Sequence, residues 1–116
     1  MKRPRISDTV KEGRKLVSDG AWGTFLQQMG LRPGECPELW CVDQPAQVEA
    51  IARRYLAAGA DMVETNSFGG SRFKLDHYGL AGRAAEINRA AAACSRAAAG
   101  DQHWVIASVG PTGMML

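Results

Sequence analysis

Residues 60–70 read ADMVETNSFGG, and this stretch decides the predicted fold. It begins as a short apolar segment around Met62 and Val63, and then changes abruptly to an acid, a hydroxyl, an amide and glycines. A buried strand of a parallel sheet has this form where its carboxyl end opens into a binding site. The stretch therefore predicts a strand whose far end carries the polar groups of a site.

Two other stretches repeat the pattern: LVSDG at residues 16–20 and VIASVGPTG at residues 105–113. The interval from Val17 to Val63 nearly equals the interval from Val63 to Ile106, and each can hold one helix and two connections. The chain therefore predicts an alternating β-α-β-α-β order, with the strands parallel and arranged 1-2-3. The predicted strands lie near residues 15–19, 61–65 and 104–109.

Apolar residues at helical spacing predict the two connecting helices. The first runs from about Pro45 to Ala58, because proline suits its first turn and Gly59 its end. The second runs from about Leu80 to Ala99. Their predicted buried positions are Val48, Ile51, Ala52, Tyr55 and Leu56 in the first, and Leu80, Ala84, Ile87, Ala91, Cys94 and Ala98 in the second.

Composition excludes several classes of protein. A net charge of +2 with scattered basic residues argues against nucleic acid and anionic membranes as partners. No apolar run approaches the ~20 residues that cross a bilayer, and no signal core follows the basic start. Three cysteines, an odd number, argue against a secreted disulfide scaffold. We expect a cytoplasmic protein.

The cysteines do not predict a metal site. Cys36 and Cys41 share a predicted loop, with no second Cys or His pair at a matching distance. Cys94 falls on the buried stripe of the second helix. We therefore expect packed free thiols and no metal ligands.

Three parallel strands would leave two open sheet edges, whereas parallel sheets are normally covered and closed or long. A (β/α)8 barrel typically takes about 250 residues. The α/β pattern thus predicts the first three βα units of a TIM-type barrel, apparently truncated, with self-association favoured through the open edges. We expect an N-terminal extension at residues 1–14 and the partial barrel at residues 15–116. A complete small open α/β domain is the alternative.

Four motifs together resemble the homocysteine-binding domain of the homocysteine S-methyltransferase family, which includes the first domain of cobalamin-dependent methionine synthase. The resemblance covers nearly the whole chain after Arg14, in matching order and spacing. The motifs are DGAWGT at residues 19–24, AGAD at 58–61, ETNSFG at 64–69 and GPT at 110–112.

The resemblance implies a zinc-dependent methyltransferase of methionine biosynthesis, built on a barrel. Homocysteine's thiol, with an ordinary pKa of ~8.5, would be held as a thiolate by zinc and would attack a methyl donor. Donors in the family include methylcobalamin, methylmethionine and betaine. Some relatives move methyl groups to or from a corrinoid protein, so a corrinoid is one candidate cofactor or partner.

The resemblance also implies substrate-binding roles. Asp19 would pair with the substrate ammonium, and the N–H groups of Gly20 and Ala21 would face its carboxylate. The floor of the site would be lined by Glu64, Thr65, Asn66 and Ser67, and its rim by Gly110, Pro111 and Thr112. From local sequence alone, Asp19 could instead cap the following helix, Glu64 could be a structural acid, and Thr65 and Ser67 could bond only to backbone.

One departure limits the resemblance. The family's zinc cysteines, and its second acid for the substrate ammonium, lie in later barrel strands, and no matching motif is present here. We therefore expect the 116-residue chain alone to be inactive, with no metal ligands of its own. A non-catalytic fragment or assembly partner is the alternative function.

Overall fold

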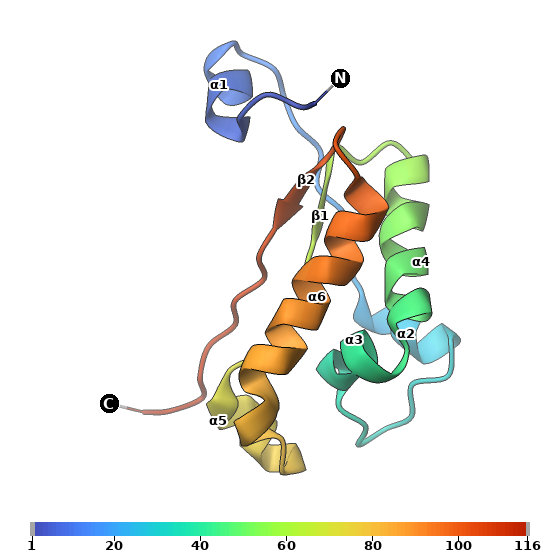
Figure 1. Cartoon of the computed structure of the whole chain (residues 1–116), viewed down its shortest axis with the longest axis vertical. Coiled ribbons are helices and arrows are strands. Elements are labelled where there is room, and N and C mark those ends of the chain that lie inside the picture. The colour runs from blue at the N-terminus through green and yellow to red at the C-terminus, as the bar shows by residue number, and fades with distance from the viewer. Residues whose placement is uncertain (1, 116) are drawn as a thin grey trace.

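β1 (Met62–Glu64) and β2 (Trp104–Ile106) run side by side in parallel in this computed structural model, which describes residues 2–115 (Figure 1). Met62 lies opposite Trp104, and Glu64 opposite Ile106. The parallel pairing predicted for the second and third strands is confirmed. The result is a mixed α/β arrangement with an open sheet.

The first predicted strand, at residues 15–19, is reduced to a single parallel bridge between Ser18 and Met62. It lies on the β1 side, so the order 1-2-3 holds for this bridge and the two strands. Val17 is 59% exposed, and its N–H bonds to the Asp61 side chain at 2.9 Å. Because little apolar surface covers Val17 and a carboxylate takes its donor, the strand does not extend. β2 is also shorter than predicted, since Ser108 bonds to a side chain instead of a strand.

Two long helices, α4 (Pro45–Ala57) and α6 (Ala84–Ala99), pack against each other and against the strands (Figure 1). Val48, Ile51 and Ala52 of α4 are fully buried, as the spacing predicts. They share one core with Val63 of β1 and Ala91 of α6. Burial of these side chains fixes where the carboxyl end of β1 lies.

The helical boundaries also differ from the prediction, in two places. Residues 36–41, predicted as a loop, form η1 (Pro37–Leu39) and the start of α3 (Trp40–Asp43), because Trp40 and Cys41 are buried against the core. The helix predicted from Leu80 begins as α6 only at Ala84, after the short turn η3 (Ala81–Arg83).

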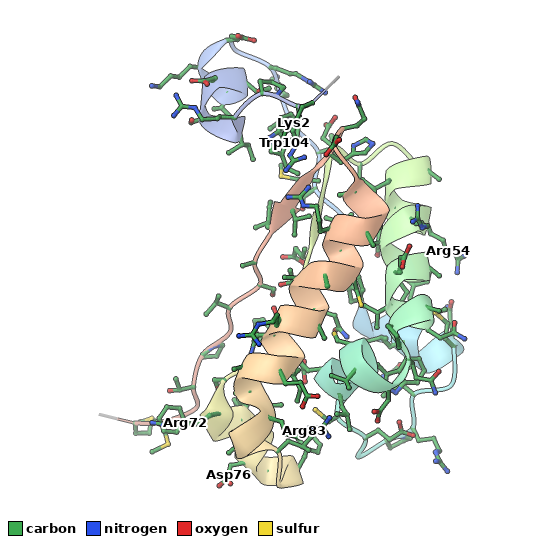
Figure 2. The ribbon with its side chains drawn as sticks, in the orientation of Figure 1. Lys2, Arg54, Arg72, Asp76, Arg83 and Trp104 are labelled. Carbon is green, nitrogen blue, oxygen red and sulfur yellow. The ribbon has the colours of Figure 1, made fainter. Side chains whose placement is uncertain are left out.

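The remaining short elements flank this framework. Trp104 lies beside the N-terminal segment, and its indole N–H donates to the Pro4 carbonyl at 3.0 Å (Figure 2). Met1 and Leu116 of the predicted ranges 1–14 and 15–116 lie outside the described residues. Among residues 2–115, none of the helices has both the length and the apolar character to cross a membrane. The other elements are α1 (Ile6–Lys11), α2 (Gly23–Gln28), α5 (Arg72–Leu75) and η2 (Asp76–Tyr78).

Candidate functional site

The carboxyl ends of the strands open into a cavity of about 300 Å³, which we call the strand-end cavity. It combines the loop after Ser18, the loop after β1, and the η1 turn. A larger hollow of about 490 Å³ lies between α5 and residues 112–114, but mostly exposed side chains border it. The strand-end cavity is lined by Gly20, Ala21, Trp22, Gly23, Leu26, Pro37, Glu38, Glu64, Thr65, Asn66, Ser67, Phe68 and Ser108.

Asp19 adjoins this cavity and is held by neutral donors. Its Oδ2 accepts the Trp22 indole N–H at 2.7 Å and the Glu64 backbone N–H at 2.9 Å. Its Oδ1 accepts the Ser18 hydroxyl at 2.9 Å. Asp19 does not cap α2, whose N-cap residue is Trp22. The carboxylate is therefore oriented, and no cation within residues 2–115 neutralises it.

The turn after Asp19 is held against α4 by Tyr55. The tyrosine hydroxyl donates to the Ala21 carbonyl, and a Cβ added at Gly20 would lie 3.2 Å from that hydroxyl oxygen. A side chain at position 20 would therefore crowd the Tyr55 ring, so this close approach favours glycine there. Within residues 2–115, the backbone N–H groups of Gly20 and Ala21 have no hydrogen-bond acceptor.

Glu64 ends β1 beside Asp19. Its side chain is half-buried, and its pKa is raised, first by burial, which disfavours the charged form, and then by the negative charge of Asp19. Its backbone is fixed at both ends, because its carbonyl accepts the buried Ser95 hydroxyl of α6 at 2.8 Å. The site therefore holds two neighbouring acids, and the charge of Asp19 disfavours ionisation of Glu64.

The hydroxyls after β1 join the two strand-end loops. Thr65 Oγ1 lies 2.5 Å from Ser67 Oγ and accepts the Ser108 N–H at 3.0 Å. Ser67 Oγ donates to the Ser108 carbonyl at 2.8 Å. Asn66 donates to the Pro37 carbonyl at 2.9 Å. The side chains of Thr65, Asn66 and Ser67 are buried, and each is hydrogen-bonded to backbone. Thr65 and Ser67 are also hydrogen-bonded to each other.

Gly110, Pro111 and Thr112 do not line the strand-end cavity. Gly110 reaches the loop after β1, where its N–H donates to the Phe68 carbonyl at 3.1 Å. A Cβ at Gly110 would lie 2.4 Å from that carbonyl oxygen, so only glycine fits. Pro111 and Thr112 border separate hollows. Their role at the rim of a substrate site stays a prediction.

Glu38 is a cavity-lining acid that sequence reasoning missed. It is only 7% exposed, and it accepts the Gly69 N–H at 3.2 Å and the Cys36 thiol at 3.6 Å. The sequence feature that could have revealed Glu38 is an acid within the otherwise apolar stretch CPELWC at residues 36–41. This stretch was predicted to be a loop. Tyr55 was also missed as a site residue, because its helical spacing marked it only as a buried position.

The thiols do not fit a zinc site. Burial raises the pKa of Cys36 and Cys94, and raises that of Cys41 to about 12. Cys41 donates to the Asn66 carbonyl at 3.4 Å, and Cys94 to the Cys41 carbonyl at 3.7 Å. Zinc ligands are thiolates, whereas these groups are held as neutral donors. In the described part of the chain, no three His, Cys, Asp or Glu side chains converge to hold a metal ion.

The sequence of this chain is similar to those of known proteins of one family. A profile of the family described as homocysteine S-methyltransferase matches residues 16–116. The chain is 34% identical over 114 residues to methionine synthase of Mycobacterium tuberculosis, and the alignment covers 88% of this chain and 10% of that protein. It is also 34% identical over 110 residues to methionine synthase of Mycobacterium leprae, and that alignment covers 84% of this chain and 9% of the relative. The chain thus spans about a tenth of the length of these curated relatives.

Proposed function

The chain belongs to the homocysteine S-methyltransferase family, and we propose that its strand-end cavity binds the amino-acid end of homocysteine for methyl transfer to the thiol. Asp19 takes the substrate ammonium, and the N–H groups of Gly20 and Ala21 take the carboxylate. Glu64, Thr65, Asn66 and Ser67 form the floor, with the last three fixed by their bonds to neighbouring backbone.

The observation that carries the proposal is a pairing of complementary groups at one turn. An unneutralised carboxylate at Asp19 is followed directly by two backbone N–H groups that have no acceptor in residues 2–115. An α-amino acid presents the opposite pair, an ammonium and a carboxylate on one carbon. Charge-assisted hydrogen bonds to ionised groups are stronger than neutral ones, so this turn favours a zwitterion over a ligand with only one charge.

Methyl transfer to homocysteine forms a sulfur–carbon bond with the sulfur's electron pair and breaks the donor's bond to the methyl carbon. The thiol proton must leave first, because the neutral thiol is the weaker nucleophile. The residues described here contribute binding and orientation, which place the sulfur relative to the donor. The family implies zinc for forming the thiolate, but residues 2–115 do not offer its ligand set, so no metal step is assigned to them.

Calorimetric titration of the 116-residue chain with three thiols tests the proposal. L-Homocysteine carries both charges, 4-mercaptobutanoate lacks the ammonium, and 3-aminopropane-1-thiol lacks the carboxylate. We expect each analogue to bind about tenfold or more weakly than homocysteine, as loss of a bond to a charged group predicts. Equal affinity for all three thiols, or no saturable binding of homocysteine, would contradict the proposal and favour a non-catalytic assembly role.

A further inference from the structure

Tyr55 makes two contacts with the turn that follows Asp19, although it comes from α4. Its hydroxyl donates to the Ala21 carbonyl, and its ring lies against Gly20, where a Cβ would be 3.5 Å from Cε1. The ring is held in turn by Phe25, whose centroid lies 5.4 Å away in an edge-on arrangement. Tyr55 is thus fixed by packing on one side and bonded to the turn on the other.

We propose that Tyr55 is a positioning residue whose hydroxyl sets the turn at residues 20–22 for binding the substrate's carboxylate. This inference rests on the proposed function, because the turn that Tyr55 contacts also carries the N–H groups of Gly20 and Ala21 that the proposed function uses. Tyr55 itself does not line the strand-end cavity and acts through the Ala21 peptide.

The geometry of the peptide bond links the Tyr55 hydroxyl to the direction of an N–H group in the turn. In a trans peptide the carbonyl oxygen and the N–H point in opposite directions. No peptide bond among residues 2–115 is cis. Since Tyr55 draws the Ala21 carbonyl towards α4, the N–H of the same peptide, which belongs to Trp22, points away from α4. Trp22 lines the cavity, and a peptide flip at this position would turn a carbonyl dipole towards an incoming carboxylate.

The Tyr55 hydroxyl is suited to this task. Its pKa is raised, first by burial and then by the charge of Asp19, so the hydroxyl stays protonated and can donate throughout the neutral range. Glycine at position 20 leaves the turn intrinsically mobile, because glycine has the widest choice of backbone conformations. A side-chain bond to the next residue is therefore a means of fixing the turn before the ligand arrives, which lowers the entropic cost of binding.

The test replaces Tyr55 by Phe in the full 116-residue chain, which keeps the ring packed on Gly20 and Phe25 and removes only the hydroxyl. Homocysteine and 3-aminopropane-1-thiol are each titrated into wild type and variant. We expect homocysteine affinity to fall about five- to tenfold, as loss of one hydrogen bond predicts, and affinity for the carboxylate-free thiol to stay unchanged. Thermal unfolding of both proteins verifies that the variant is folded.

Tyr78→Phe is the matched control, because Tyr78 is 44% exposed and lines a different hollow. It should leave both affinities at wild-type values. Unchanged homocysteine affinity in Tyr55→Phe would overturn the inference, and so would an equal loss for both thiols, which indicates a general packing role. If wild type does not prefer homocysteine over the analogues, the proposed function fails. If that preference is present and Tyr55→Phe retains it, only the inference fails.

Discussion

The Asp19 carboxylate accepts the backbone N–H of Glu64 at 2.9 Å, across a sequence separation of 45 residues. This bond joins the turn after the first, minimal strand to the carboxyl end of β1. The strand pairing there is a single bridge at Ser18, so a side chain supplies part of the connection that a longer ladder would give. The contact that positions Asp19 thus also helps to hold the first strand segment against β1.

Asp19→Asn should weaken homocysteine binding about 10- to 100-fold, because the substrate ammonium loses a charged acceptor. The amide oxygen can still accept from Trp22 and Glu64, so the fold should persist. Affinity for 4-mercaptobutanoate, which has no ammonium, should not fall. Calorimetry measures both, with the exposed Asp76→Asn as control. Equal weakening of both ligands would argue against an ammonium contact.

Glu64→Gln should stabilise the chain at pH 7 and have little effect at pH 4. The pKa of Glu64 is raised in the folded state, so that state holds the proton more tightly than the unfolded chain. Stability from this group is present below its ordinary pKa of 4.5 and is lost as the pH rises through the folded value. Urea unfolding at both pH values gives the comparison, and a loss of stability at pH 7 would refute the predicted sign.

The free energy of unfolding should fall as the pH rises above 9. Burial raises the pKa of Cys41 from 9.0 to about 12, so between these values the unfolded chain binds fewer protons than the folded one. The slope from this thiol is at most about 1.4 kcal/mol per pH unit. Urea unfolding from pH 7 to 10.5 should show a smaller slope for Cys41→Ala. Identical slopes would mean that Cys41 does not titrate as described.

Gly110→Ala should destabilise the chain by about 1–3 kcal/mol, the usual cost of overpacking. A Cβ at this position would lie 2.4 Å from the Phe68 carbonyl oxygen, so the two strand-end loops must separate. Gly82→Ala is the control, since its added Cβ meets nothing within 4 Å. Urea unfolding compares the two variants, and a cost at position 110 no larger than at position 82 would exclude the close approach.

The purified chain should retain well under about half an equivalent of zinc after dialysis and should not methylate homocysteine, because a catalytic zinc needs about three protein ligands. Cys36, Cys41 and Cys94 are each buried, and their thiols bond to separate oxygen atoms. Elemental analysis and a methyl-transfer assay on the same sample test this. Retention of one equivalent of zinc together with methyl transfer would contradict this prediction, because it would require a set of zinc ligands that residues 2–115 do not show.

Local patterns predicted much of this protein. Helical spacing and the flanking Pro45 and Gly59 predicted α4 within one residue of its observed end. The buried face of an amphipathic helix is visible in the sequence as apolar residues that recur at helical spacing. The parallel pairing of residues 62–64 with residues 104–106 followed from alternation of strand and helix. The helix depends on residues that are close in the chain, whereas the pairing depends on the order of strands and helices along it.

The first strand and the η1 turn were mispredicted for a shared reason. Val17 looks like a strand residue, but whether it pairs depends on what covers it, and 59% of it is exposed. Residues 36–41 were predicted as a loop, but burial of Trp40 and Cys41 against the core makes most of them helical. Tertiary packing overrode local preference in both places.

By itself, the sequence determined which polar residues stand at the strand ends, since Asp19, Glu64 and Thr65 each follow an apolar segment. Only the tertiary structure decided which groups face the cavity and what holds them. Glu38 and Tyr55 come from a turn and a helix far from those motifs, and they reach the site through packing. Gly110 was predicted at the rim of the site, and packing places it against Phe68, beside the cavity lining. A motif fixes residue type and order along the chain, whereas contacts between distant segments depend on how buried surfaces fit together.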